Sequence, residues 1–311
     1  MNNIVEISNL SKDYEVGFWK KKKVRALDDL TLSVQGGQIF GFLGGNGAGK
    51  TTTIKILMTL LFPTNGTAKI LGHDISDTSM HARIGYCPEN PYFYDYLSAF
   101  ELMGYFGSLF GMEESRRNKK AEELLTKVGL DEKDWHKQLR KFSKGMLQRV
   151  GLAQSLINDP ELVFLDEPMS GLDPMGRREV RELIAGLRDQ GKTVFMSTHI
   201  LSDVEALCDE VAILRKGKLA ASGKLDDLLA TQAENQVFEV TIRGLSAEGM
   251  TLTGVNADQI TARGNAVTIR VDDESEIGTI LAEARKQGGR LASVQPTKQS
   301  LEELFVSKTA E

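Results

Sequence analysis

Hydrophobic and polar residues follow two different patterns in the first part of the chain, and both predict strands. Residues 4–10 and 30–34 alternate between apolar and polar side chains, as strands with one buried face do. Short and mostly apolar runs occupy residues 38–43, 161–166 and 193–197. Such runs are typical of strands that are buried on both faces within a parallel sheet.

Segments with a helical pattern lie between these strands. Apolar residues recur three and four positions apart at 51–61 and 176–190, and over much of the longer segment 90–158. A further strand is expected over 210–223. Because strands alternate with helices, the sequence predicts an α/β domain over residues 1–230, built on a parallel sheet and carrying a helical subdomain at about 90–158.

The pattern changes after about residue 230, where shorter strand-like and helical segments follow one another. They predict a small α+β domain over residues 231–311, appended to the larger domain. The expected strands cover 236–245, 265–273 and 290–296, and the expected helices cover 276–288 and 300–308.

Composition restricts the classes of protein that the chain can represent. The formal net charge of −5 does not favour binding to nucleic acid or to an anionic membrane. Cys87 and Cys208 lie far apart, so they predict neither a disulfide framework nor a metal site, and they fit a reducing compartment. No apolar run approaches the roughly 18 residues that a spanning helix needs, and the N-terminus lacks a signal-peptide pattern. If the protein works at a membrane, we expect another chain to cross it.

A glycine-rich turn joins the predicted strand at 38–43 to the predicted helix at 51–61, which is the context that a phosphate-binding loop requires. Backbone N–H groups of such a turn and the positive end of the helix dipole form a site for polyphosphate. We expect Lys50 to reach the β- and γ-phosphates and the Thr51 hydroxyl to bind Mg²⁺. The loop consists of Gly44, Gly45, Asn46, Gly47, Ala48, Gly49, Lys50 and Thr51. By itself it predicts only a P-loop NTPase, a class that includes kinases, GTPases and motors.

An acidic pair follows the apolar run at 161–166. Asp166 ends the predicted strand, and Glu167 comes directly after it. Because ligands of open α/β sheets bind at the carboxyl ends of the strands, Asp166 is placed to hold Mg²⁺ through a water molecule. Glu167 is placed to polarise the attacking water as a general base. A charged strand end in solvent is the common alternative, and the phosphate loop argues against it.

Residues 142–149, with the sequence FSKGMLQR, begin a predicted helix. Ser143 lies near its N-cap, where a hydroxyl, backbone N–H groups and the helix dipole together form a second anion site. Taken alone, the segment is an ordinary helix cap. Its position in the chain is more informative, because the order and spacing of four residues match those of one family. These residues are Lys50, Ser143, Asp166 and His199.

Residues 142–149 resemble the signature motif, usually written LSGGQ, of the ATP-binding cassette (ABC) proteins. The resemblance covers about residues 3–230 and is specific because several motifs occur in order. It implies a P-loop NTPase core with a mixed sheet and a helical subdomain, which binds ATP and Mg²⁺ and hydrolyses the ATP. It also implies a head-to-tail homodimer, in which the signature motif of one copy engages the γ-phosphate bound by the other.

The resemblance assigns roles to further residues. Tyr14 matches the aromatic residue that stacks on adenine. Residues 170–174 resemble the D-loop, which lies across the dimer interface. His199 matches the switch histidine that contacts the γ-phosphate, so Glu167 and His199 are the expected catalytic residues. The expected nucleotide-binding residues are Tyr14, Gly44, Gly45, Asn46, Gly47, Ala48, Gly49, Lys50, Thr51, Thr52, Ser143, Gly145 and Asp173, and the expected metal ligands are Thr51, Glu89 and Asp166.

Three motifs depart from the family pattern. Gly45 replaces the usual proline of the phosphate loop, which leaves every phosphate-facing amide available. Glu89 stands where glutamine is usual, in the segment 84–90 that aligns with the Q-loop, and a carboxylate there can still bind the metal. The signature motif has Lys144 for its first glycine and Met146 for its glutamine. Lys144 adds a positive charge beside a bound phosphate.

An aromatic run over residues 91–97, with the sequence PYFYDYL, follows the Q-loop segment. Two interpretations are equally compatible with it. One is packing in the core. The other is docking of the coupling helix of a membrane subunit, because the family uses this neighbourhood for docking and clustered Tyr and Phe suit an interface.

Together the motifs predict the ATPase subunit of a bacterial ABC transporter, which powers a separate integral-membrane permease at the cytoplasmic face of the inner membrane. Residues 296–308 resemble the tails of bacterial exporters whose ATPase is a separate chain, so export is favoured over import. The alternative is a soluble ABC ATPase that acts on ribosomes or DNA without a permease. A single phosphate loop, the short span between residues 51 and 142 and the net charge of −5 disfavour it, and no nucleic-acid partner is expected.

Overall fold

The computed structural model describes residues 3–17, 22–230, 238–245, 260–271 and 273–296. The chain divides into two compact units, Met1–Leu225 and Asp226–Glu311. The boundary lies a few residues before the one expected at residue 230, because nearly all of the short helix α7 (Leu225–Ala230) belongs to the second unit.

A six-stranded sheet with the order β10-β9-β3-β8-β7-β6 forms the centre of the first unit. Its neighbouring strands are parallel except for β9 and β10, which pair antiparallel. The single strand predicted over 210–223 is therefore wrong: Lys216 and Gly217, both with positive φ, make a tight turn that folds this segment into a hairpin. The strands are β3 (Ile39–Leu43), β6 (Ile84–Cys87), β7 (Leu162–Asp166), β8 (Thr193–Thr198), β9 (Glu210–Arg215) and β10 (Lys218–Lys224).

A second, antiparallel sheet with the order β2-β1-β4-β5 packs against the first. Its two long strands extend well beyond the alternating segments at 4–10 and 30–34 that predicted them. Buried residues of both sheets and of α1 (Lys50–Leu57) form one hydrophobic core. Within that core the ring of Phe195 lies 5.2–5.4 Å from the rings of three other phenylalanines. The strands are β1 (Asn3–Val16), β2 (Lys22–Gln35), β4 (Asn65–Ile70) and β5 (His73–Asp74).

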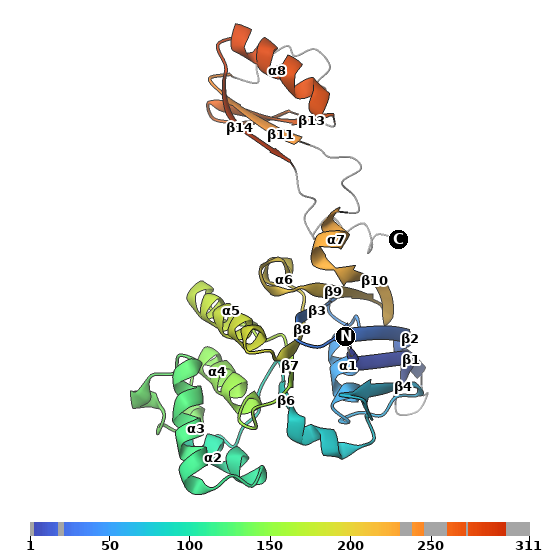
Figure 1. Cartoon of the computed structure of the whole chain (residues 1–311), viewed down its shortest axis with the longest axis vertical. Coiled ribbons are helices and arrows are strands. Elements are labelled where there is room, and N and C mark those ends of the chain that lie inside the picture. Colours follow the sequence, from blue (N-terminus) through green and yellow to red (C-terminus); the bar gives the residue numbers. More distant parts are fainter. Residues whose placement is uncertain (1–2, 18–21, 231–237, 246–259, 272, 297–311) are drawn as a thin grey trace. The chain divides into compact units, whose positions relative to one another are not determined.

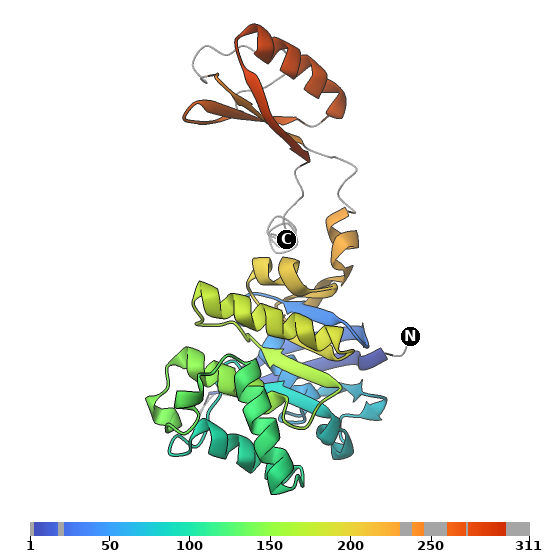
Figure 2. The same cartoon turned by 60° about the vertical axis from the view of Figure 1, so that its left-hand side comes forward.

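The predicted helical subdomain lies to one side of the sheets in the first unit (Figure 1, green; Figure 2). Ser98 begins its first helix with a reciprocal capping box to Glu101, and Ser143 caps its last helix. Its helices are α2 (Ala99–Leu109), α3 (Glu114–Lys127) and α4 (Lys144–Ser155), with 3₁₀ turns at Glu132–Asp134 and Leu139–Lys141. The remaining helices of the unit are a 3₁₀ turn at Thr78–Arg83, α5 (Pro174–Asp189) and α6 (Leu201–Leu207).

The second unit contains a four-stranded antiparallel sheet with the order β12-β13-β11-β14, covered on one face by α8 (Glu274–Lys286). Ile280 and Ala284 of α8 are buried against alternate residues of β11 and β13. The predicted strands and the helix at 276–288 are present, whereas β12 was not predicted and the helix expected at 300–308 lies outside the described residues. The strands are β11 (Phe238–Arg243), β12 (Ile260–Arg263), β13 (Ala266–Val271) and β14 (Arg290–Pro296).

Within the described parts of both units, none of the helices combines the length and the apolar character needed to cross a bilayer.

Candidate active site

A pocket of about 340 Å³ opens at the carboxyl ends of the parallel strands of the first unit. The turn between β3 and α1 forms most of its wall, and residues that follow β6, β7 and β8 complete it. Ligands of open α/β sheets bind at this edge. The lining residues are Ala26, Gly45, Asn46, Gly47, Ala48, Gly49, Lys50, Thr51, Thr52, Glu89, Glu167 and His199.

The backbone of the turn requires glycine where it matters most for phosphate binding. Gly47 and Gly49 have φ values of 76° and 110°. A Cβ atom on Gly49 would also lie 2.7 Å from the carbonyl oxygen of Ala26, so a side chain has no room there. Gly49 caps α1 without a side-chain hydrogen bond, which leaves the first N–H groups of the helix available to an anion.

Lys50 is only 7% exposed, and its ammonium group has three acidic or polar neighbours, of which the carbonyl oxygen of Gly45 is the most distant at 3.5 Å. It donates a hydrogen bond to the carbonyl oxygen of Gly44 at 2.7 Å and lies 3.3 Å from Oε1 of Glu167. Gly44 itself is absent from the pocket wall and contributes through this carbonyl. A buried ammonium held at the loop is the cation that polyphosphate binding needs.

Glu167 connects the phosphate loop to His199. Both of its carboxylate oxygens lie 2.9 Å from Nδ1 of His199, and the side chain is 7% exposed. Its backbone has φ of 49°, a left-handed conformation that costs a residue of this kind about 1–3 kcal/mol. Its N–H donates to the carbonyl of Ser197 at 3.1 Å, which ties the strained residue to β8. Strain of this kind concentrates at functional sites.

Asp166 lies below the pocket, at the end of β7. It is 1% exposed and accepts a short hydrogen bond from the hydroxyl of Ser197. Thr51 and Glu89, the other two predicted metal ligands, line the pocket directly. Asp166 is therefore buried and absent from the pocket wall, unlike the other two predicted ligands.

Tyr14 of β1 is absent from the pocket wall, but its hydroxyl oxygen lies 3.4 Å from Oγ1 of Thr52, which lines the pocket. The ammonium of Lys12 lies 5.5 Å from the centre of the same ring. Ala26 of β2 lines the pocket beside it, although the sequence reasoning did not select it. Ala26 follows Arg25, which lies opposite Asp13 in the pairing of β2 with β1. Local sequence patterns do not reveal this pairing, so they could not select Ala26.

Ser143, Gly145 and Asp173 are absent from the pocket wall. The hydroxyl of Ser143 accepts the N–H of Met146 at 3.2 Å, and Asp173 accepts the N–H of Gly176 at 2.9 Å, so both residues cap helices. A Cβ atom on Gly145 would lie 3.3 Å from the side chain of Leu172, which places the signature motif against the D-loop segment of the same chain. One copy of the chain thus assembles two separate groups of the predicted residues.

Four features define the class, which is that of the P-loop NTPases: a buried strand, a glycine-rich loop with Lys50, a helix, and an acidic residue that ends another strand of the same sheet. Comparisons with known proteins narrow the class. Residues 27–170 match the family model "ABC transporter", and residues 223–309 match "ATP-binding protein DrrA1-3-like, C-terminal domain".

Relatives match the chain over nearly its whole length. An ABC transporter ATP-binding protein of Synechocystis is 44% identical over 99% of this chain and 85% of its own. The daunorubicin/doxorubicin resistance ATP-binding protein DrrA of Streptomyces peucetius is 33% identical over 98% and 92%. The bacitracin transport ATP-binding protein BcrA of Enterococcus faecalis is 31% identical over 98% and 96%.

Solved structures agree with the sequence relatives. A dimeric ATP-binding cassette in a post-hydrolysis state, bound to ADP and Pi, aligns with a TM-score of 0.67 and 26% identity, covering 71% of this chain and 98% of that one. The ATP-binding subunit of an ABC transporter aligns with a TM-score of 0.64 and 31% identity, covering 73% and 92%. This chain belongs to the family of ABC transporter ATP-binding proteins and is an ATPase, which confirms the predicted family, fold and activity.

Proposed function

We propose that this chain is the ATP-binding and ATP-hydrolysing subunit of a bacterial exporter and that it powers a separate integral-membrane permease. The observation that carries the proposal is the group formed by Lys50, Glu167 and His199 at one end of the pocket. Relatives named for bacitracin transport and for resistance to daunorubicin and doxorubicin support export, because a transporter confers resistance by removing the drug from the cell.

In the proposed reaction, water attacks the γ-phosphorus and Glu167 takes its proton, while the bond from that phosphorus to the β–γ bridging oxygen breaks and ADP leaves with the electron pair. The N–H groups of the phosphate loop and the ammonium of Lys50 hold the phosphates and stabilise the charge of the transition state. His199 holds the Glu167 carboxylate at 2.9 Å and lies at the pocket wall, within reach of the γ-phosphate. Catalysis is then mainly a matter of positioning.

The pocket suits a magnesium ion that arrives with the nucleotide. Among the described residues there is no cluster of three or more His, Cys, Asp or Glu side chains that could form a self-contained metal site. Mg²⁺ does not need one, because it keeps several waters and uses substrate phosphates with one or two carboxylates. Thr51, Glu89 and Asp166 are the residues that would hold it. Once bound, it would neutralise charge on the β- and γ-phosphates.

Two copies would pair head to tail and complete each site. This arrangement explains why Ser143, Gly145 and Asp173 lie together outside the pocket of their own chain. In the dimer they would face the γ-phosphate bound by the other copy. The dimeric form of related cassettes supports the pairing.

An aromatic surface beside the Q-loop is the proposed docking site for the permease. Tyr92 is 99% exposed, and Tyr94, Tyr96, Tyr105 and Phe110 are also exposed. Tyr94 is in ring contact with Tyr96 and Tyr105, at 5.9 and 6.0 Å between centroids. Tyr92 and Phe110 also line a hollow of about 350 Å³. Packing in the core, one of the two interpretations of residues 91–97, is therefore wrong for the exposed tyrosines. Clustered exposed aromatic rings are characteristic of interfaces.

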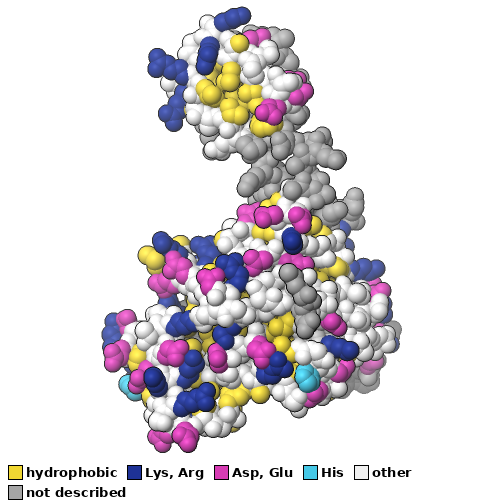
Figure 3. Space-filling model, viewed as in Figure 1, with side chains coloured by type: hydrophobic (Ala, Val, Ile, Leu, Met, Phe, Trp, Pro, Cys, Tyr) yellow, Lys and Arg dark blue, Asp and Glu magenta, His cyan; other side chains and the backbone are white. Residues whose placement is uncertain are grey.

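On the face shown in Figure 3, positive and negative side chains of the first unit intermingle, which gives no support to a nucleic-acid surface.

The test of the proposed function is purification of the tagged chain from membranes and identification of the protein that accompanies it. We expect a polytopic membrane protein, and we expect replacement of Tyr92, Tyr94 and Tyr96 by serine to release it without lowering ATPase activity in detergent. Recovery only with ribosomes or in soluble fractions would contradict the proposal.

A further inference from the structure

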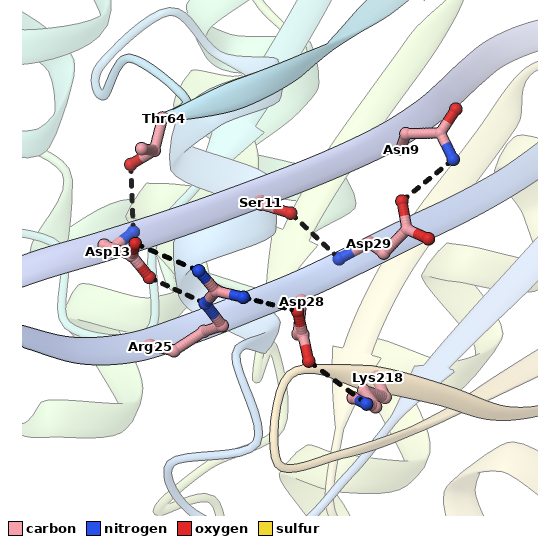
Figure 4. A network of polar contacts seen from close by, with 8 residues as sticks. All are labelled: Asn9, Ser11, Asp13, Arg25, Asp28, Asp29, Thr64 and Lys218. Carbon is pink, nitrogen blue, oxygen red and sulfur yellow. Dashed lines mark hydrogen bonds and ion pairs between the residues drawn. The ribbon is translucent and has the colours of Figure 1, made fainter.

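Figure 4 shows eight polar residues near the hairpin of β1 and β2, and their contacts form two separate groups. Arg25 lies at the centre of the first group, which is a connected network: it donates to both carboxylate oxygens of Asp13, at 2.8 and 3.2 Å, and to Asp28 at 2.9 Å. The other oxygen of Asp28 pairs with the ammonium of Lys218 at 3.1 Å. Thr64 completes this network by accepting the N–H of Asp13 at 3.0 Å, whereas Asn9, Ser11 and Asp29 form the second group.

The part of β1 that carries Tyr14 has no described strand pairing with β4, and its contacts include the N–H of Asp13 with the Thr64 hydroxyl at 3.0 Å and the Tyr14 hydroxyl with Thr52 at 3.4 Å. The described pairing of β1 with β4 ends at Ser11, whereas the pairing of β1 with β2 continues to Val16. Tyr14 lies directly after Asp13, and its own partner across the hairpin is Val24. The Asp13–Arg25 pair is a side-chain link across the hairpin, one residue before Tyr14.

The other end of the network reaches the phosphate loop through the backbone. The N–H of Asp28 donates to the carbonyl of Gly217 at 2.9 Å, and the N–H of Gly217 donates to the carbonyl of Ala48 at 2.9 Å. A Cβ atom on either Gly49 or Gly217 would lie 2.7 Å from the carbonyl oxygen of Ala26. The backbone of β2 thus contacts both the phosphate loop and the β9–β10 turn. Lys218, the first residue after that turn, pairs with Asp28 of the network.

We propose that Arg25 is a positioning residue that sets the place of Tyr14 relative to the phosphate loop and thereby governs recognition of the nucleobase. The inference rests on the proposed role of Tyr14 in stacking on adenine. Arg25 is absent from the wall of the pocket that contains Lys50, Glu167 and His199, so we expect it to act on binding of the base and to leave the chemical step unchanged. Its bidentate geometry matters, because two parallel bonds fix an angle as well as a distance.

The test compares two ligands in the full-length chain: Mg–ATP and Mg–tripolyphosphate, which carries the phosphates without a base. For Arg25→Ala we expect the Kd and KM for ATP to rise about 5-fold, as partial loss of a base-stacking contact predicts. The kcat and the Kd for tripolyphosphate should stay within about 2-fold of wild type, since the phosphate loop is unchanged. Arg178→Ala, which breaks an exposed pair with Glu182 on α5, is the control.

Three results would overturn the inference. In the first, Tyr14→Ala weakens ATP binding but Arg25→Ala and the milder Asp28→Asn do not, which rejects the role of Arg25 and leaves the proposed function standing. In the second, Arg25→Ala weakens ATP and tripolyphosphate equally, which shows general damage to the site. In the third, Tyr14→Ala changes neither ligand, which rejects the stacking role of Tyr14 together with the inference.

Discussion

The two ends of the proposed nucleotide site differ in the kinds of chemical group that form them. The phosphate end consists of a glycine backbone and of buried side chains that hold one another, with Lys50 between Gly44 and Glu167. In the proposed function the nucleobase end consists of one ring, Tyr14, on a hairpin joined by the ion pairs of Arg25. The Lys50 and Glu167 side chains are buried, whereas that of Arg25 is 53% exposed. On this proposal the chemical step occurs at the phosphate end, and the base end contributes only affinity. Substitutions at the two ends should therefore differ in size and in the kinetic constant that changes.

The largest effect is expected from Glu167→Gln. The amide keeps the shape of the side chain but cannot accept the proton of water, so kcat should fall by about 100-fold or more. ATP binding should persist, and an ATP-bound dimer should accumulate in size-exclusion chromatography. The matched control is Glu179→Gln on α5, whose carboxylate pairs with Arg149 away from the pocket. Normal turnover by Glu167→Gln would remove Glu167 from the role of general base.

The next effect is expected from Gly49→Ala. A side chain at this φ costs about 1–2 kcal/mol before the contact with Ala26 is counted, so the Kd for ATP should rise by about 10-fold or more. Gly45→Ala is the control within the same loop, because Gly45 has no heavy atom within 4 Å of its Cβ position and no positive φ. Isothermal titration of both variants checks the difference. Equal losses would mean that backbone geometry does not limit phosphate binding.

A smaller effect is expected at the base end. Tyr14→Ala should weaken ATP binding by about 5- to 100-fold, the range for loss of one base-stacking contact, with little change in kcat. Tyr14→Phe keeps the ring and loses only the long contact with Thr52, so it should bind ATP nearly as wild type does. Steady-state kinetics with both variants measure the separation of KM from kcat. A fall in kcat with Tyr14→Ala would break the division between the two ends.

The smallest effect is expected from acidification. A hydrogen bond from Arg25 lowers the pKa of Asp13, and one from Lys218 lowers the pKa of Asp28. A carboxyl whose pKa is lowered by folding contributes stability above its unfolded pKa, near 3.9, and loses it as the pH falls through the folded pKa. The difference in Tm between wild type and Arg25→Ala should therefore be small and constant from about pH 8 to 5 and shrink only below about pH 4. A difference that grows on acidification would contradict the assigned sign.

The sequence predicts the phosphate end better than the base end, and the reason is distance along the chain. Gly44 to Thr51 form a site from consecutive residues, whose chemistry can be read locally. Asp13, Arg25 and Lys218 meet only through the pairing of β1 with β2 and the turn after β9, and no local pattern records that pairing. The position of Tyr14 came from the family resemblance alone.

Backbone conformation limited the prediction in a similar way. The segment 210–223 has the composition of one long strand, but positive φ at Lys216 and Gly217 divides it into a hairpin. Glu167 occupies a left-handed conformation that its residue type does not favour, and only the surrounding contacts with Ser197 and His199 explain it. β12 was missed because it is a four-residue strand whose only described neighbour is β13.

The contact between Lys144 and Gly171 has a consequence for the variation allowed among relatives. A Cβ atom on Gly171 would lie 3.0 Å from Cδ and Cε of Lys144, so the lysine side chain covers the glycine. Gly171 also has φ of 73°, which asparagine tolerates better than other residues. The two positions should therefore covary: asparagine at position 171 is expected where residue 144 is small and is disfavoured where it is lysine. An alignment of full-length relatives can count the pairs directly.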